Sequence, residues 1–567
     1  MMRMGHSINL LINCGIQMMF LRYALGLLSN QKVCLKQCYI KIYTKDKTDT
    51  LKLAHFSIKE YLISEHIQKH SQKQIVQFSL SAELSHSVIS QICVAYLLQF
   101  SQPQLDRNIE KSSPLAIYAA KEWIFHVKSC SNAKSEPCSL LALMLKLFTS
   151  NDMVFVNWVR IWDIDRENFN ENSTELFREK AFIAGPLYYA SMAGLNDIVY
   201  NLLENGADIN RQKGLLGNAL QAASYKGHET TVKLLLENGA DVNARGGSYE
   251  TALEAASFKG HKAAVKLLLE NGADANITGG NGVGSALLGA SRHGDETVVK
   301  LLLEKGADVN FTGGPYGQAL QAATYGNHEA VVNLLLKEGA DVNMQGWKGG
   351  SALQTASFLG HQTIAELLLE RGADVNIQGE DDRSALQAAS FRGNEKIVKL
   401  LLGKGADVNA QGGDFGSALQ AASVDGNKAI IKLLLEKGAD VNAQGGKYGN
   451  ALQAASFIGN DKIVKLLLEK GADMNAQGGK YGNALQAALV GGKEAVVKLL
   501  LENGADMNAL GNEFEVMLQV QMHQEYENTI KLLHKHGASV EKKYGKVIQA
   551  KIDQKYKNII KLLMKSR

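Results

Sequence analysis

The chain has 567 residues, of which 46% are hydrophobic and 21% are charged, and its formal net charge is +4. A charge this close to neutral predicts no broad nucleic-acid-binding surface, because such a surface needs a marked excess of lysine and arginine. We therefore expect an intracellular protein, cytoplasmic in the first place, with the nucleus as the alternative.

Residues 1–23 form an N-terminal segment without a clear assignment. The apolar run from Ile8 to Leu21 contains Asn13 and Gln17. It is shorter than the roughly 18 to 20 residues that a membrane-spanning helix needs. No clear cleavage site of small residues follows it. We expect no membrane partner, and a signal or anchor is the alternative.

The composition of the following region differs from that of the rest of the chain. All six cysteines lie before residue 139. Cys34 and Cys38 form a lone CxxxC without a second pair at metal-ligand spacing, so reduced thiols are expected and no metal site is predicted.

The segment LKLAHFSIKEYLISEHI, residues 51–67, resembles the winged-helix region that follows the nucleotide-binding module of fungal NACHT-type regulatory ATPases. Residues 114–127 and 157–163 resemble the helical connector of the same proteins. The resemblance implies a winged-helix-like domain of the deacylase- or NACHT-associated type over residues 24–100 and a helical connector over 101–182. It also implies a longer ancestor, and both a natural short form and an incomplete gene model remain open.

Motifs of catalysis are missing from the sequence. It contains no GxxxxGK[ST] phosphate loop, no GxSxG nucleophile elbow and no HExxH zinc motif. His228 and Glu229 are followed by Thr230, Thr231 and Val232, so the second histidine of the zinc motif is missing, and a structural role is predicted for His228. We therefore predict no catalytic residue, no cofactor, no small-molecule substrate and no enzyme activity.

A glycine-centred pentapeptide, GAD followed by an apolar residue and Asn, recurs through the rest of the chain. Every gap between its glycines is 33 residues, except one of 34. Such a period indicates a solenoid whose units bury their apolar faces against their neighbours. The glycines are Gly206, Gly239, Gly272, Gly306, Gly339, Gly372, Gly405, Gly438, Gly471, Gly504 and Gly537, and the last copy decays to GASVE.

One unit shows the local physics. Asn450 is predicted to cap a short inner helix, ALQAASF, which Gly459 ends. The second, outer helix, DKIVKLLLEK, has a broad apolar face opposite its charged residues. Gly471 supplies the left-handed residue that ends this helix. The segment NAQGGKYG then forms a hairpin-like loop to the next unit.

This pattern is similar to the ankyrin repeat and covers residues 183–567. The usual TPLH is replaced by Asn or Ser followed by ALQ, and the combination GGxYGNALQAAS resembles the arrays of fungal NACHT-type proteins. We predict a mostly α-helical fold: an ankyrin solenoid of about twelve units, the last two acting as caps, behind a smaller N-terminal domain. The lysine-rich C-terminus is interpreted as a solvated face, with nucleic-acid contact or nuclear import as alternatives.

The resemblance implies a non-catalytic interaction protein that binds a protein partner on the concave face of its array, as the arm of a signalling or NLR-like system. A structural scaffold and a truncated form of a larger NTPase are the alternatives. The pair of residues before the glycine that ends each inner helix varies between units, which predicts partner contacts there. The predicted contact residues are Tyr225, Lys226, Phe258, Lys259, Arg292, His293, Tyr325, Phe358, Phe391, Arg392 and Phe457. Packing of these rings against the next unit is the alternative.

Two further expectations concern the loops. An aromatic residue recurs at one hairpin position, which predicts a structural ladder of Tyr249, Tyr316, Phe415, Tyr448, Tyr481 and Phe514. Asn172, Asn276 and Asn310 each begin an NxT sequon, and we expect none of them to be glycosylated.

Overall fold

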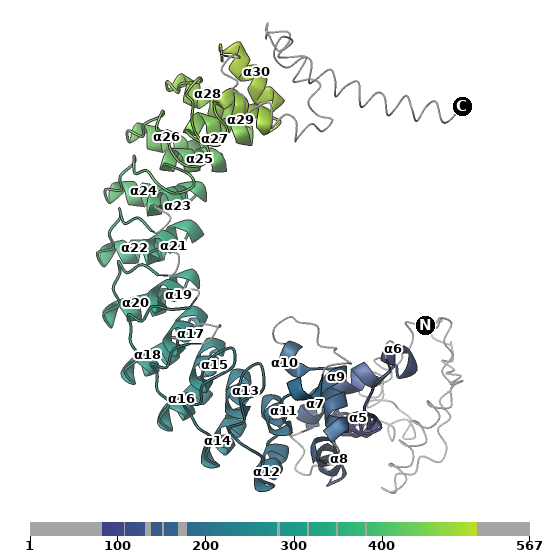
Figure 1. The fold of residues 1–567 in the computed structure, drawn as a ribbon. Helices are drawn as coiled ribbons and strands as arrows, with labels where there is room; N and C mark the ends of the chain where they lie inside the picture. Colours follow the sequence, from purple (N-terminus) through teal and green to yellow (C-terminus); the bar gives the residue numbers. More distant parts are fainter. Residues whose placement is uncertain are drawn as a thin grey trace, which may run out of the picture. The chain divides into compact units, whose positions relative to one another are not determined.

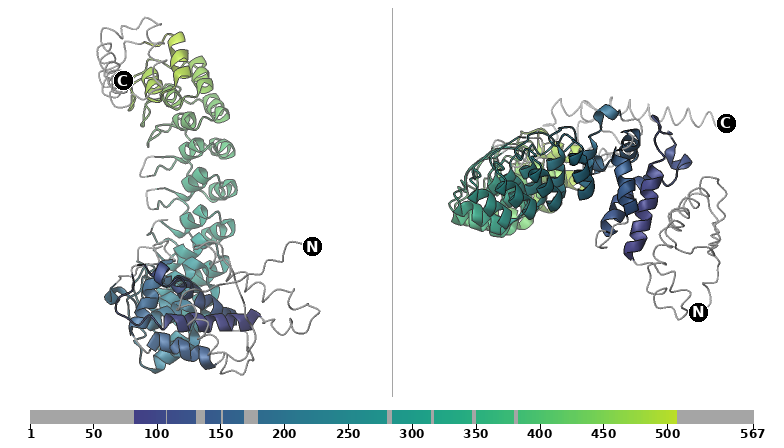
Figure 2. Two further views of the ribbon diagram at one scale, coloured as in Figure 1. Left: turned by 90° about the vertical axis from the view of Figure 1, so that its right-hand side faces the viewer. Right: turned by 90° about the horizontal axis from the view of Figure 1, so that it is seen from below.

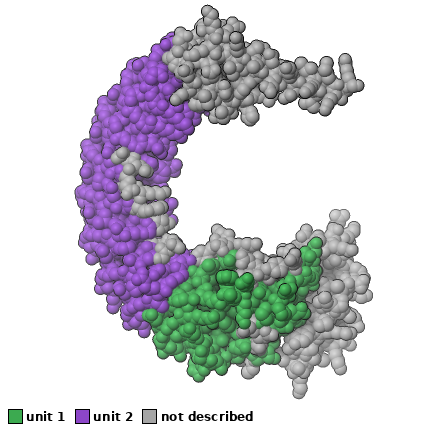
Figure 3. All heavy atoms as spheres, in the orientation of Figure 1, with its two compact units in different colours: residues 1–241 green, residues 242–567 purple. Residues whose placement is uncertain are grey.

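The computed structural model describes residues 82–106, 108–130, 138–149, 152–167, 179–279, 284–314, 317–346, 350–379 and 383–506. The chain divides into two compact units, residues 1–241 and 242–567 (Figure 3). Several predictions concern residues outside the described ranges. These predictions concern most of the winged-helix-like region, the Cys34–Cys38 pair, the two C-terminal caps and the basic C-terminus. Asn172, Tyr316 and Phe514 also lie outside the described ranges.

The first unit begins with short helices upstream of the repeats. The described part of residues 24–100 consists of one long helix and a turn, and the described part of residues 101–182 is helical. No single described helix is long and apolar enough to cross a bilayer. Residues 139–149 and 153–166 meet the requirements of length and composition only when taken together, and they are bent by 94° relative to each other. The helices are α5 (Ala82–Leu97), α6 (Ile109–Ser112), α7 (Ala116–Cys130), α8 (Cys138–Thr149), α9 (Asp152–Ile161), α10 (Ile164–Glu167) and the 3-10 turn η1 (Lys180–Phe182).

An aromatic core joins these helices to the first repeat. That repeat consists of α11 (Pro186–Ala193) and α12 (Asn196–Glu204), and the next of α13 (Ala219–Lys226) and α14 (Glu229–Glu237). The ring of Trp158 lies edge-on to Trp123 at 5.5 Å and to Tyr189 at 5.9 Å. All three side chains are buried. Such ring pairs add to the stabilisation that burial of their apolar area provides.

Two buried carboxylates complete this contact. The hydroxyl of Tyr189 donates to Asp163 Oδ1 at 2.9 Å, and that of Tyr188 donates to Asp165 Oδ1 at 2.7 Å. Leu215 N donates to the second oxygen of Asp165 at 2.8 Å. Burial, and next the charge of Asp165, hold the pKa of Tyr188 well above its ordinary value. The upstream helices therefore cover the apolar face of the first repeat within this unit, as a terminal cap of a solenoid must.

The second unit is a stack of helix pairs, in which each inner helix packs on the inner helix of the next pair (Figures 1 and 2). The inner helices are α15 (Ala252–Lys259), α17 (Ala286–His293), α19 (Ala319–Tyr325), α21 (Ala352–Leu359), α23 (Ala385–Phe391), α25 (Ala418–Asp425), α27 (Ala451–Ile458) and α29 (Ala484–Val490). The outer helices are α16 (Lys262–Glu270), α18 (Glu296–Glu304), α20 (Glu329–Lys337), α22 (Gln362–Glu370), α24 (Glu395–Gly403), α26 (Lys428–Glu436), α28 (Asp461–Glu469) and α30 (Glu494–Glu502). The predicted fold class is confirmed.

The predicted helix signals act as expected. Asn450 accepts a hydrogen bond from the backbone N–H of Gln453, whose side chain in turn accepts from the N–H of Asn450, which makes a capping box. Gly459 ends α27 with φ +92°, a left-handed conformation that glycine adopts cheaply. On the outer helix α28, Ile463, Val464 and Leu467 are buried, as the apolar periodicity predicts.

The hairpins between units explain the GGKYG sequence. Six of the described hairpins are closed by a single antiparallel bridge, such as Gly445 with Gly449. A Cβ on Gly446 would lie 2.4 Å from the backbone nitrogen of Gly416 in the preceding hairpin, and its φ is +59°. Only glycine satisfies both requirements, so the hairpins can pack directly on one another.

Candidate functional site

A buried glutamine on several inner helices joins neighbouring units. Gln387 Nε2 donates to Gly416 O at 2.7 Å and to Ala410 O and Gly412 O at 3.3 Å, all in the next unit's hairpin. Gln420 and Gln453 repeat these contacts one and two units further on. We call this set, Gln387, Gln420 and Gln453 with their carbonyl acceptors, the glutamine clamp. It gives a physical reason for ALQ in place of the usual TPLH.

The irregular part of the array departs from the clamp. Glu254 takes the glutamine position there, is fully buried, and accepts from Gly284 N at 3.0 Å. Leu288 takes it in the following unit and has no side-chain donor. Both substitutions adjoin the one 34-residue gap of the array.

The asparagine of GADxN forms a second link between units. Asn276 Nδ2 donates to Gly306 O at 2.8 Å, and its Oδ1 accepts from Asp308 N at 2.8 Å. Both ends of the amides of Asn276 and Asn310 are thus engaged, although the side chains lie at the surface. The same pair of bonds recurs at Asn243, Asn310, Asn343, Asn376, Asn409 and Asn442.

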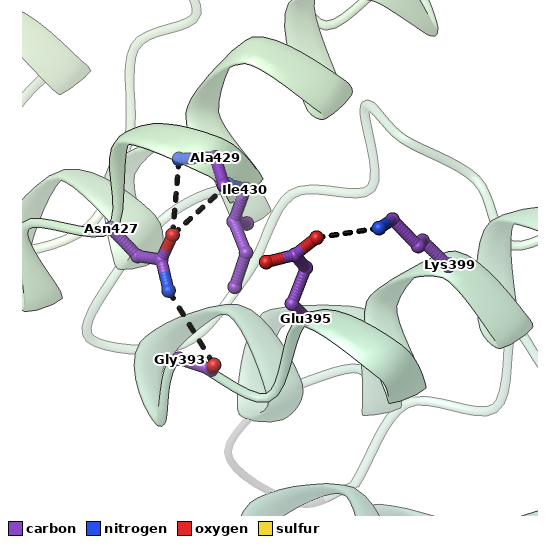
Figure 4. Close-up of polar contacts among 6 residues, drawn as sticks. All are labelled: Gly393, Glu395, Lys399, Asn427, Ala429 and Ile430. Atoms are coloured by element: carbon purple, nitrogen blue, oxygen red, sulfur yellow. Dashed lines mark hydrogen bonds and ion pairs between the residues drawn. The ribbon is translucent and has the colours of Figure 1, made fainter.

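A third link starts at the N-cap of the outer helices. Asn427 Oδ1 accepts from Ala429 N and Ile430 N, while its Nδ2 reaches Gly393 O of the preceding unit at 3.5 Å (Figure 4). His328 makes the corresponding contact with Arg292 O at 3.1 Å, and Asn394 with Ser357 O at 2.7 Å. In the first unit, His228 Nε2 lies 3.0 Å from Met192 O. The histidine at this position therefore has a structural role.

The outer helices present paired charges. Glu395 and Lys399 form an ion pair one helical turn apart (Figure 4). Lys266–Glu270, Lys300–Glu304 and Lys498–Glu502 do the same at 3.8 to 4.0 Å. Exposed pairs of this kind contribute little to stability.

The predicted contact residues at the inner-helix ends differ in exposure. Tyr325 is 48% exposed, and Lys259, His293 and Arg392 are exposed as well. Tyr225 is only 4% exposed, so the expectation of an accessible ring fails at this residue. The others, Lys226, Phe258, Arg292, Phe358, Phe391 and Phe457, are half-buried.

Hairpin rings and inner-helix rings form one row instead of two. Phe415 of a hairpin stacks on Phe391 of the preceding unit at 4.2 Å, and Tyr481 stacks on Phe457 at 4.5 Å. Phe391 also stacks on Phe358 at 6.4 Å. The rings therefore pack between units, as the alternative interpretation of the sequence predicts. Phe358, Phe391, Phe415 and Phe457 remain half-buried, whereas Tyr481 is buried.

Cationic side chains lie on this row. The Arg392 guanidinium is 4.9 Å from the ring centre of Phe358, and that of Arg292 is 4.8 Å from Tyr325. Lys447 and Lys480 lie 5.9 Å from Tyr448 and Tyr481. Such contacts hold a positive charge at the surface without neutralising it.

One carboxylate of the row is perturbed. Partial burial of its carboxylate raises the pKa of Asp425, and the positive charge of Arg392 opposes that shift. Asp425 and Arg392 occupy the same position in successive units and are both exposed. Because this position holds an arginine in one unit and an aspartate in the next, the sign of the charge along the row changes between these units.

A polar cluster between α5 and α7 was missed by the sequence analysis, because its members are far apart in the chain. His86 Nδ1 lies 2.7 Å from His126 Nδ1, and the Tyr118 hydroxyl lies 3.0 Å from His126 Nε2. Burial, with a smaller effect of Glu122, raises the pKa of Cys93 to about 12, so this thiol stays protonated and unreactive. No group of three metal-ligating side chains converges in the described residues.

Comparison with known proteins supports the repeat assignment. A family model described as "Ankyrin repeats (3 copies)" matches residues 186–279, 287–379, 348–414, 377–445 and 419–511, which together exceed half of the chain. A protein of Monascus ruber named "Azaphilone pigments biosynthesis cluster protein L" is 39% identical over 154 residues. That stretch is 27% of this chain and 31% of the relative, so the chain matches about a third of the relative's length. The helix pairs, their 33-residue period and this family match agree, and the chain belongs to the ankyrin-repeat family.

Proposed function

We propose that this chain is a non-catalytic interaction protein that binds a protein partner along the ends of its inner helices. One observation carries the proposal. Residues that recur in nearly every unit, such as Gln387 and Asn376, are engaged in links between units. The residues that differ from unit to unit at the inner-helix ends include the accessible Tyr325, Arg392 and Ile458. Exposed aromatic and arginine side chains are typical anchors of protein interfaces.

The partner-binding array belongs, in this proposal, to a cytoplasmic regulatory system of the NLR-like type. The likeness of residues 51–67 to a NACHT-associated region supports this context, and so does the match to a protein of a fungus. A general scaffold is the second candidate. Its support is the extent of the links between units, which would stabilise an array whatever it carries.

The experiment compares variants of the full chain as bait for partner capture and then measures the affinity of the captured protein. Tyr325→Ala and Arg392→Ala are expected to weaken binding by at least about 2 kcal/mol, the cost of losing an interface anchor. Lys399→Ala, on an outer helix, is the matched control and should leave the affinity unchanged. Phe391→Ala is less suitable, because loss of its stacking on Phe415 should lower stability as well.

The two candidates give different results. Binding that is lost in both inner-helix variants, with unchanged melting curves, supports a specific interaction protein. A captured nucleotide-binding protein would favour the regulatory system over the scaffold. Equal affinity of all variants would refute the proposed surface.

A further inference from the structure

Four successive inner helices, α17, α19, α21 and α23, carry a patch that differs from the rest of the row. Apolar side chains occupy its middle, where Tyr325 is 48% exposed and Leu359 is half-buried, and Gly326 adds no charge between them. An arginine stands at each end. We call this set the central patch: Arg292, Tyr325, Phe358, Leu359, Phe391 and Arg392.

The two arginines lean toward each other across the patch. Arg292, on α17, places its guanidinium over the ring of Tyr325 on the following inner helix, at 4.8 Å. Arg392, which follows α23, places its guanidinium over Phe358 on the preceding inner helix, at 4.9 Å. A guanidinium group held over a ring keeps its charge and its planar fork of N–H donors, through which arginine binds a carboxylate with two hydrogen bonds.

Each ring of the patch has a neighbour on at least one face. Arg292 lies over Tyr325, Arg392 lies over Phe358, and Phe391 is stacked between Phe358 and Phe415 at 6.4 and 4.2 Å. A nucleic-acid base needs an open ring face for stacking. The half-buried Leu359 and the exposed part of Tyr325 instead suit aliphatic side chains.

We propose that the central patch binds an extended protein segment in which apolar residues lie between two carboxylates. This inference rests on the proposed function and names the chemistry of the partner. In the unbound protein the neighbouring carboxylate is Asp425, which interacts with Arg392 and would be replaced by a partner's carboxylate.

The spacing of the partner's carboxylates follows from the repeat. Packed helices lie about 8–10 Å apart, and an extended chain advances about 3.3 Å per residue, so roughly three residues correspond to one unit. The arginines belong to helices three units apart, but Arg292 reaches toward Tyr325 and Arg392 toward Phe358, which brings each guanidinium about half a unit inward and leaves about two units between the two groups. Carboxylates about six residues apart in an extended segment would therefore reach both guanidinium groups.

The test uses the full chain and fluorescent synthetic peptides. The main probe has two glutamates about six residues apart with leucines between them. The comparison probes are the same peptide with lysines for the glutamates, a peptide of identical composition with adjacent glutamates, and a single-stranded oligo(U). The main probe should bind at least about tenfold more tightly than each of the others.

Variants of the arginines make the test specific. Arg292→Gln and Arg392→Gln should each weaken binding of the main probe at least about tenfold, while Arg392→Lys retains part of it because a lysine keeps the charge but not the planar fork. The control is Arg371→Gln, because Arg371 pairs with Asn333 away from the inner-helix ends. This variant should bind like the wild type.

Three results would overturn the inference: equal binding of the acidic and lysine peptides, binding that ignores both arginine variants, or oligo(U) binding as tight as that of the main probe. If the captured partner still depends on Tyr325 while the acidic peptide does not bind, only the inference fails and the proposed function stands. If the partner is also indifferent to Tyr325, both fail.

Discussion

At the scale of single residues, the N-cap position of the outer helices is occupied by histidine in some units and by asparagine in others. His328 and Asn394 both reach a backbone oxygen near the end of the preceding inner helix, at 3.1 and 2.7 Å. Histidine can add a proton in the physiological range, whereas asparagine cannot. His361, which holds this position before α22, should therefore respond to acid, whereas Asn394, which holds it before α24, should not.

His361→Asn tests this difference. Burial lowers the pKa of His361 below its ordinary value, and its hydrogen bond to the backbone of Tyr325 opposes that shift only in part. A histidine whose pKa is lower in the folded than in the unfolded state contributes stability above the unfolded pKa, about 6.5, and loses it as the pH falls. The melting temperature of the wild type should thus fall more steeply between about pH 7.5 and 5.5 than that of the variant. Parallel pH curves from calorimetry would contradict this account.

At the scale of elements, the glutamine clamp explains why the inner helices stack in register. Gln420 holds three carbonyls of the next hairpin, and its own Oε1 receives the N-cap N–H of Ser417. A buried carbonyl left without a donor costs free energy comparable to a lost hydrogen bond. Loss of the clamp should therefore lower the free energy of unfolding by more than the loss of the same number of exposed hydrogen bonds.

Gln420→Met retains the side-chain volume and removes every hydrogen bond of the clamp in one unit. We expect the free energy of unfolding to fall by about 2 kcal/mol, because buried carbonyls and an N-cap N–H lose their partner. Denaturant unfolding followed by circular dichroism measures the change. Gln411→Met, on an exposed side chain, is the control. Equal unfolding midpoints for the two variants would show that water satisfies the carbonyls that Gln420 leaves behind.

Tyr189→Phe tests the contact between the upstream helices and the first repeat. It leaves the aromatic core in place and removes one donor from Asp163, a carboxylate that is only 2% exposed. A hydrogen bond to a buried charge is worth about 1.5–3 kcal/mol, so a loss of stability in that range is expected. Tyr200→Phe, on an exposed ring, should have no effect. Hydrogen exchange would locate the change in α9 and α11 if the account is correct.

At the scale of the whole molecule, nearest-neighbour stacking predicts tolerance to the loss of complete units. Deletion of Gly412 to Gln444 removes 33 residues and brings two equivalent hairpin sequences together. A folded, shorter array is expected, whereas deletion of about half that number should break the stack locally. Thermal melts and limited proteolysis of both variants check this. Similar stability of the two deletion variants would argue against a stack in which each complete unit contacts only its neighbours.

Much of this fold could be predicted from the sequence, because helix pairs, caps and the repeat are encoded locally. The partners of repeated residues could not. Gln387 has the same sequence surroundings whether it bonds to its own hairpin or to the next one, so only the structure identifies the acceptor as Gly416 O. For the same reason the sequence places Phe391 among the partner contacts and Phe415 in the hairpin ladder, although the two rings stack at 4.2 Å. Asp163 and Tyr189 carry no periodic signal at all.

The direction of the glutamine clamp has a consequence for synthesis of the chain. Each clamp reaches forward, from Gln387 to Gly416 and from Gln420 to Gly449, so its acceptors are translated later than the glutamine itself. A nascent unit therefore carries a polar amide that cannot be buried favourably until the following hairpin has left the ribosome. We expect co-translational folding of the array to lag one repeat behind its emergence, and a ribosomal pause placed just before a hairpin to expose the preceding inner helix to chaperones.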